Sequence, residues 1–251
     1  MIDVKLKADF SAVMKMFEDQ QKQVRFAAAV ALTEVAKAVQ AAEYGEMKTV
    51  FDRPNPFTLR SLYLDRATPQ KLKATVWLKD DFTGGMNAGH YLLPQIRGGT
   101  RIAKAFERAL ARIGVLPAGM VAVPASGAKL DNYGNMSRGQ IVQILSYFEA
   151  FGEQGYTANI TPERRRRLAK GTKKRLGTAY FVPRDGRLAL GIWQRFHFVQ
   201  GSAIKPVLLF YSHVGYRAIY RFAEVGNATI EREWPGQFKA ALTAAFATAR
   251  A

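Results

Sequence analysis

The sequence contains no cysteine. This absence excludes a disulfide framework, a zinc–thiolate site and a cysteine nucleophile, and it fits a reducing compartment or a robust assembled particle. No apolar run approaches the roughly 18 residues that a membrane-spanning helix needs. The opening stretch, Met-Ile-Asp-Val-Lys-Leu-Lys, also lacks the apolar segment of a signal peptide. We therefore expect no membrane contact, and synthesis and use in the cytosol unless a partner carries the protein elsewhere.

Acidic residues are scarce: 20 Asp and Glu stand against 37 Lys and Arg, which gives a formal net charge of +17. Such a field attracts nucleic acid, acidic membranes or acidic protein surfaces, and it does not choose among them. A solvated basic surface with no specific partner is the remaining alternative. The hydrophobic fraction of 48% over 251 residues indicates an ordered globular protein.

The patterns that usually mark an active site are missing as well. The three histidines, His90, His197 and His213, are too far apart in sequence for a helical zinc motif. The adjacent pair Asp80-Asp81 would point to opposite faces of a strand, so it is a poor magnesium site. Ser126–Lys129 matches S-x-x-K without the companion motifs of that enzyme class. We predict no catalytic residue, no cofactor and no metal, and a protein that is not an enzyme.

Hydrophobic periodicity predicts the elements of the first half. A long helix begins at Asp9 or Ser11 and continues to about residue 42, with apolar residues at helical spacing. Gly45 and the prolines that follow predict irregular structure, and the glycines further on predict a loop. The expected strands lie at residues 2–6, 59–66 and 72–79, the irregular segment at 45–57 and the loop at 81–100.

The second half predicts two short helices, a three-stranded meander and a final helix. Thr100 and Ser137 are expected to cap the short helices. Pro235 should break or kink the final helix. The fold class is therefore α+β: a mainly antiparallel sheet flanked by a long N-terminal helix and a C-terminal helix, with a loop-rich middle insertion. We expect a single domain over residues 1–251, with a basic insertion or long loop at 152–176, and the meander at 178–183, 188–199 and 204–212.

The sharpest local feature is a basic run with eight cations in twelve residues. Charges this dense repel one another and resist burial, so we expect the run to be exposed. Thr161-Pro162-Glu163 can begin a short helix there. The run contacts DNA phosphates, docks on an acidic protein neighbour, or is a solvated insertion; the sequence leaves all three open. The predicted partner or DNA contacts are Arg164, Arg165, Arg166, Arg167, Lys170, Lys173, Lys174 and Arg175.

Two stretches carry a resemblance to a known family. One is Tyr91-Leu-Leu-Pro-Gln-Ile-Arg-Gly-Gly-Thr-Arg-Ile-Ala-Lys-Ala-Phe-Glu-Arg-Ala-Leu110, and the other is Ile204-Lys-Pro-Val-Leu-Leu-Phe210 with the alanine-rich end at Phe238–Arg250. Together with the order of elements, they resemble phage minor tail proteins of the Z type and the related tail-completion and head–tail joining (neck) proteins of long-tailed bacteriophages. The insertion at 152–176 departs from the smaller members of that family.

The resemblance implies a structural virion protein at the neck or upper tail, which joins head and tail or completes the tail. It implies a homo-oligomeric ring that contacts connector, tail-terminator or tail-tube subunits, with possible non-specific contact with packaged DNA. No active-site residue carries over. The expected location is the virion, and the host cytoplasm during assembly. The alternative from the charge alone is a non-sequence-specific DNA-binding accessory protein.

Overall fold

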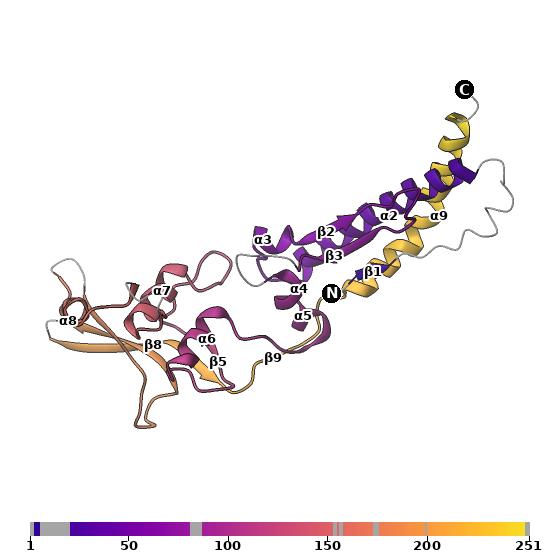
Figure 1. Cartoon of the computed structure of the whole chain (residues 1–251). Coiled ribbons are helices and arrows are strands. Elements are labelled where there is room, and N and C mark those ends of the chain that lie inside the picture. Colours follow the sequence, from indigo (N-terminus) through magenta and orange to yellow (C-terminus); the bar gives the residue numbers. More distant parts are fainter. Residues whose placement is uncertain are drawn as a thin grey trace. The chain divides into compact units, whose positions relative to one another are not determined.

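A computed structural model describes residues 3–5, 21–80, 87–152, 155, 158–172, 176–198 and 200–248 (Figure 1). It is a mixed α+β structure with antiparallel sheets, a long N-terminal helix and a C-terminal helix, which confirms the predicted fold class. The chain divides into two compact units. Unit 1 comprises Met1–Gly99 and Tyr216–Ala251, and unit 2 comprises Thr100–Gly215.

This division differs from the single domain that we expected. Unit 2 is inserted whole between the two sequence segments of unit 1, and each unit buries its own hydrophobic clusters. The predicted insertion at 152–176 is therefore only one part of a much larger inserted body. Sequence composition missed the boundary because unit 2 begins and ends in short glycine-containing segments that resemble ordinary loops.

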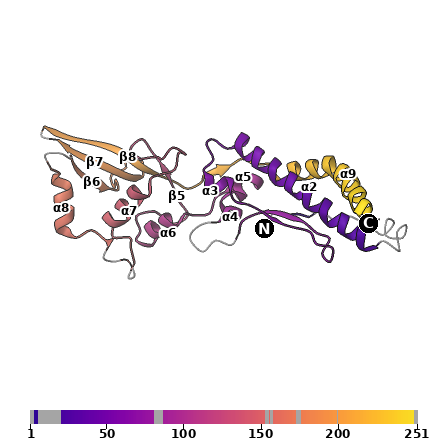
Figure 2. The same cartoon turned by 90° about the horizontal axis from the view of Figure 1, so that it is seen from above.

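Two long helices dominate unit 1. Helix α2, Gln21–Val50, and helix α9, Phe222–Thr248, pack along each other and lie side by side in Figures 1 and 2. Alanines at the contact face of α2, such as Ala27, Ala28 and Ala31, are buried. Small side chains let a neighbouring helix approach closely, so the alanine-rich second half of the predicted helix has a packing role.

A three-stranded antiparallel sheet completes the core of unit 1. Its order is β1 (Asp3–Lys5), β3 (Thr75–Leu78), β2 (Leu62–Asp65). Leu32 and Val39 of α2 pack against Val76 of β3, and Ile230 of α9 lies on the same cluster. All three strands fall within runs that the sequence predicted. Strands β2 and β3 are shorter than the runs 59–66 and 72–79, and of the run 2–6 only residues 3–5 are described.

Helix α2 ends later than predicted, because tertiary packing overrides local propensity. It continues through Gly45 to Val50, since Glu43 and Met47 are fully buried on the face that meets Phe222. Likewise α9 runs through Pro235 without a break, and Figure 2 shows it bending along its length. The expected irregular segment therefore begins only after Val50.

Three short helices occupy segments that we expected to be irregular. Asn55 caps α3 (Pro56–Leu59) and Asn87 caps α4 (Ala88–Tyr91), each through its side-chain oxygen. Helix α5, Leu93–Arg97, follows directly. The backbone carbonyl of Gln95 accepts hydrogen bonds from the Ile219 and Tyr220 amides, which fixes the chain just before α9.

Unit 2 is built on a four-stranded antiparallel sheet. Its order is β5 (Val121–Pro124), β8 (Gly201–Tyr211), β7 (Gly191–Phe198), β6 (Gly177–Phe181). Helices α6 (Ala105–Arg112) and α7 (Arg138–Tyr147) pack on it through a core that includes Leu110, Ile144 and Ile192. The predicted meander is confirmed, and so is the Ser137 cap of α7. The expected Thr100 cap is wrong, because Thr100 lies in a short strand and Lys104 is the N-cap residue of α6. Helix α8, Pro162–Lys170, lies in the predicted basic segment, and β4 (Gly99–Thr100) and β9 (Gly215–Tyr216) form a separate two-stranded ladder.

Gly191 permits an unusually close approach of β7 to β8. The register passes from Ile192–Leu208 to Trp193–Pro206, which makes Val207 the extra residue of a β-bulge. A Cβ added at Gly191 would lie 2.1 Å from the Leu208 carbonyl oxygen, a contact that only a backbone shift can relieve. A side chain at this position is therefore incompatible with the present strand pairing.

We expect Gly191→Ala to lower the free energy of unfolding of unit 2 by about 1–3 kcal/mol, the usual cost of forcing extra volume into a packed site. Urea denaturation followed by Trp193 fluorescence measures this in a chain whose Trp77 and Trp234 are phenylalanine. Gly139→Ala in α7 is the matched control, because an added Cβ there meets nothing within 4 Å. The control should be neutral or slightly stabilising; equal losses in both variants would contradict the bulge argument.

Candidate functional site

Helix α8 places the predicted basic run on a regular element. The Thr161 hydroxyl accepts a hydrogen bond from the Arg164 amide, Pro162 occupies the first turn, and Glu163 lies near the positive end of the helix. Gly171 ends the helix with a φ of 71°, a conformation that favours glycine. The sequence Thr161-Pro162-Glu163 therefore predicted the start of this helix correctly. The helix in turn gives its arginines defined positions.

Arg165 differs from the other cations of α8. It donates hydrogen bonds to the Tyr147 carbonyl oxygen and to the Glu149 carboxylate, both at 2.7 Å. Its guanidinium lies 5.0 Å from the centre of the Tyr147 ring, and that ring meets the buried Tyr180 edge-on. Arg165 thus fastens α8 to the end of α7, a structural contact that sequence reasoning did not separate from its neighbours.

The remaining described cations of the run point outward. Their residues are exposed, and none makes an ion pair with an acid in the part of the chain that the structure describes. The C-terminal end of α8 lies against the start of β6, where a Cβ on Gly177 would be 1.9 Å from the Ala169 carbonyl oxygen. The exposed cations are Arg164, Arg166, Arg167 and Lys170, whereas Lys173, Lys174 and Arg175 lie outside the described residues.

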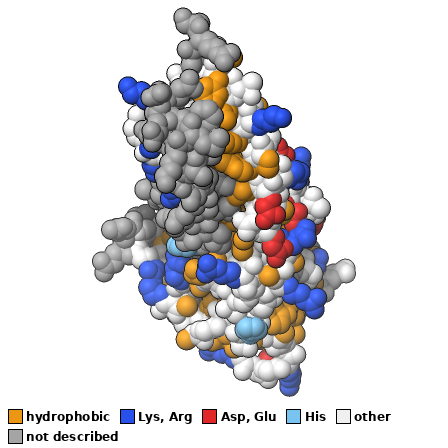
Figure 3. All heavy atoms as spheres, turned by 90° about the vertical axis from the view of Figure 1, so that its right-hand side faces the viewer, with side chains coloured by type: hydrophobic (Ala, Val, Ile, Leu, Met, Phe, Trp, Pro, Cys, Tyr) orange, Lys and Arg blue, Asp and Glu red, His pale blue; other side chains and the backbone are white. Residues whose placement is uncertain are grey.

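The positive charge is unevenly divided between the units. Unit 2 contains 18 Lys and Arg against six Asp and Glu, so it carries +12 of the total of +17. On the face shown in Figure 3, Lys and Arg side chains are spread widely, while the Asp and Glu side chains gather in one area. The basicity predicted for the whole chain is therefore mainly a property of the inserted unit.

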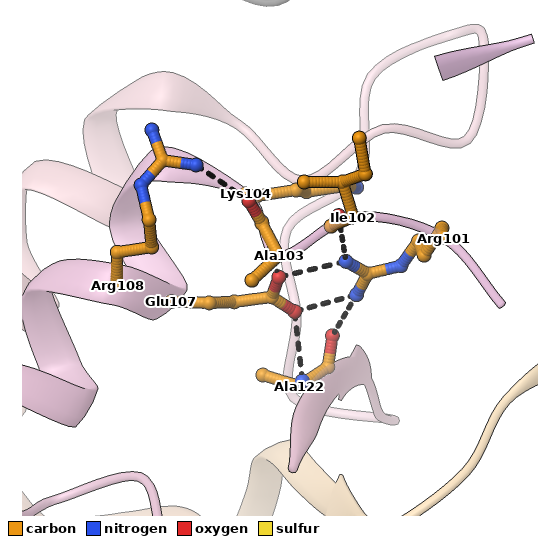
Figure 4. Close-up of polar contacts among 7 residues, drawn as sticks. All are labelled: Arg101, Ile102, Ala103, Lys104, Glu107, Arg108 and Ala122. Carbon is orange, nitrogen blue, oxygen red and sulfur yellow. Dashed lines mark hydrogen bonds and ion pairs between the residues drawn. The ribbon is translucent and has the colours of Figure 1, made fainter. Parts of the chain in front are cut away.

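Beside α6, unit 2 has a pocket of about 310 Å³. Arg101 and Glu107 are among its polar lining residues, Leu116 and Met120 are among its apolar ones, and His213 also lines it. Figure 4 shows the hydrogen bonds between Arg101 and Glu107. Arg101 donates to both oxygens of Glu107, at 2.7 and 2.5 Å, and also to the Ala122 carbonyl oxygen. This network ties the segment before α6 to strand β5.

Glu107 is fully buried and fully satisfied. Its two oxygens also accept the backbone amides of Lys104, at 2.6 Å, and Ala122, at 2.8 Å. Burial alone would raise the pKa of Glu107, but the hydrogen bonds from Arg101 and the two amides outweigh it and hold the pKa below its ordinary value. A carboxylate with every lone pair engaged is a poor acid or base, so Glu107 stabilises the local structure and is poorly suited to exchange protons.

A second buried acid, Glu43 of α2, has the opposite environment. The Tyr220 hydroxyl is buried near its carboxyl group, but no hydrogen bond with full geometry reaches either Glu43 oxygen from the described residues. Burial raises the pKa of Glu43 to about 8; the nearby Tyr220 hydroxyl and the Gly226 backbone oppose this rise, and the Glu46 carboxylate adds to it. Nothing in the sequence pattern signals this pair, because the two residues lie far apart in the chain.

The described residues contain no group of three or more His, Asp or Glu side chains that can hold a metal ion. Ser126 and Lys129, the S-x-x-K pair, are both exposed, and no hydrogen bond joins them in the described structure. His90, His197 and His213 lie in separate elements or loops. In the described helices, no segment is both long enough and apolar enough to cross a bilayer.

Comparisons of the chain with protein-family models, with curated proteins and with solved structures give no match.

Proposed function

We propose that this chain is a structural protein of a phage virion, placed at the neck or upper tail, where it joins head and tail or completes the tail through contacts with neighbouring subunits. The observation that supports this proposal most directly is the hairpin of β7 and β8 in unit 2. Among the described residues, the outer end of this hairpin is exposed on both faces and one strand edge there has no backbone partner, as expected of an arm that another protein completes.

The edge of β8 is only partly covered. Strand β5 pairs with Leu208–Tyr211, and the Gly127 amide reaches Pro206. On that side, the backbone of Gly201–Lys205 has no partner among the described residues. A strand edge of this kind can accept a strand or loop of a neighbouring protein through main-chain hydrogen bonds.

Apolar side chains lie on both faces of the same hairpin. Ile204, 39% exposed, stands opposite Arg195 on one face, and Phe198, 47% exposed, stands opposite Gly201 on the other. A hairpin end with apolar groups on both faces and no covering layer gains stability when a partner buries it. One chain offers this arm, and a different surface of the next subunit would receive it, which is the heterologous contact that closes a ring.

The stretches behind the family resemblance fall on regular elements. The first covers α5 and α6, and the second covers β8 and the C-terminal part of α9. The long helices of unit 1 and the basic unit 2 suit a protein that packs among other subunits beside a DNA path. Connector, tail-terminator and tail-tube subunits are the proposed neighbours, with a ring of identical chains as the proposed assembly.

A free DNA-binding accessory protein is the second candidate, favoured by the charge of unit 2. It needs no exposed apolar hairpin, because phosphate contacts are polar. The two candidates therefore differ in what the hairpin does: it is essential for an assembly protein and dispensable for a free DNA-binding protein.

We expect the double variant Phe198→Ser, Ile204→Ser to weaken assembly. Without burial of these two side chains by the partner, each subunit contact should lose about 2–3 kcal/mol of binding free energy, or roughly 30–150-fold in affinity. The measurement is plaque yield when the variant complements a phage that lacks this protein.

Leu130→Ser, Tyr133→Ser is the matched control, since both side chains are exposed and apolar but lie outside the hairpin. The control should restore plaque formation. Full complementation by the hairpin variant, in a protein that unfolds normally, would remove the main support for an assembly role.

A further inference from the structure

We propose that the outward side chains of α8 bind the phosphate backbone of duplex DNA, while Arg165 holds the helix in place. The binding residues are Arg164, Arg166, Arg167 and Lys170. This inference does not rest on placement at the neck, and the two proposals can fail separately. A virion protein that does not contact DNA would contradict only this inference, and a DNA-binding protein outside the virion would contradict only the proposed function.

The helical period sorts the cations by direction. At about 100° per residue, with Arg164 as the origin, Arg165 and Ala169 fall near 100° and 140°. Those two residues are the half-buried ones of α8. The four binding residues fall between about 200° and 360°, on the side away from the anchor, and Glu163 of the first turn falls among them near 260°. The helix therefore presents a convex arc of cations, fixed from behind by the contact between Arg165 and Tyr147.

The chemistry of this arc favours phosphate over an acidic protein. Three of its four cations are arginines, whose planar guanidinium groups match phosphate oxygens in pairs. Protein interfaces depend on buried apolar and aromatic anchors. The exposed apolar side chains of α8 are Pro162 and Leu168, which fall near 160° and 40°, both outside the arc. A surface with charge and almost no apolar area suits a backbone of repeated phosphates.

The same arc argues against reading of base sequence. Helix α8 is nine residues long, and its outward side chains are the four cations and Glu163, with no Asn or Gln to complement a base edge. Contacts of this kind position a protein on DNA without specifying a sequence. The +12 charge of unit 2 extends the attraction beyond the helix. We therefore expect binding that depends on salt and not on sequence.

The test is the salt dependence of DNA binding by the full chain. Fluorescence anisotropy with a labelled duplex of mixed sequence, from about 50 to 200 mM salt, gives the slope of log K against log salt. In the variant Arg164→Gln, Arg166→Gln, Arg167→Gln, Lys170→Gln, the slope should fall by about 3–4, and the affinity by roughly 10²–10³-fold. All four side chains are exposed, so the circular dichroism spectrum should stay unchanged.

The matched control removes four exposed cations from unit 1, with the same change of net charge: Lys22→Gln, Arg66→Gln, Arg97→Gln and Lys239→Gln. It should change the slope by less than about 1. Equal losses in the two variants would overturn the assignment to α8, because any four charges would then suffice. Competition by poly-glutamate as strong as that by duplex DNA, at equal charge, would overturn the choice of phosphate over an acidic protein.

Discussion

Replacing Arg101 with methionine is expected to lower the free energy of unfolding of unit 2 by about 3–5 kcal/mol, because it leaves a buried carboxylate without its counter-charge. Glu107 is completely buried, and two of its four hydrogen bonds come from the Arg101 guanidinium. The backbone amides of Lys104 and Ala122 would remain as its only described donors. Trp193 fluorescence during urea denaturation, in a chain without the other two tryptophans, reports this unit.

The double variant Arg101→Met, Glu107→Leu is the control for that loss. When both charges are removed together, no unpaired ion remains, so much of the stability should return. The two backbone amides that Glu107 accepts would still lose their partner, so the recovery should be incomplete. A single variant that unfolds like the wild type would show that the network does not stabilise unit 2.

The second large effect concerns pH and Glu43. Its pKa in the folded protein is about 8, above the ordinary value of 4.5, so the folded state retains a proton that the unfolded state releases. The resulting stability is fully present below pH 4.5 and is lost as the pH rises toward 8. Between pH 5 and pH 7.5, the free energy of unfolding of unit 1 should fall by roughly 3 kcal/mol.

Glu43→Gln should remove most of this pH dependence, since an amide cannot ionise. Urea denaturation at several pH values measures it in a Trp193→Phe chain, where Trp77 and Trp234 report unit 1. Glu34→Gln, on the same helix but 43% exposed, is the control and should retain the wild-type slope. A wild-type stability that is constant or increases over this pH range would contradict the raised pKa that burial gives Glu43.

Local signals in the sequence predicted the local structure well. Ser137 and Thr161 mark the starts of α7 and α8, and in both cases the hydroxyl accepts the expected backbone amide. The three-stranded meander was also predicted, and its strands are β6, β7 and β8. Such features depend on neighbours a few residues away, which is the range that a sequence pattern describes.

Long-range features were not accessible in the same way. The division into two units, the passage of α2 through Gly45 and the bond between Glu107 and the Ala122 amide all depend on residues that meet only after folding. The basic run illustrates the limit for the candidate site. Its charge was evident from composition, but only the folded position of Tyr147 shows that Arg165 points inward.

Electron microscopy of particles made by the encoding phage without this chain tests the central proposal most directly. If the chain is a neck or tail-completion protein, filled heads and tails should accumulate separately, or joined particles should lose their DNA. Supplying the wild-type chain should restore intact virions, and supplying the hairpin variant should not. Complete, DNA-retaining and normally joined particles in its absence would contradict a structural role at the neck or upper tail.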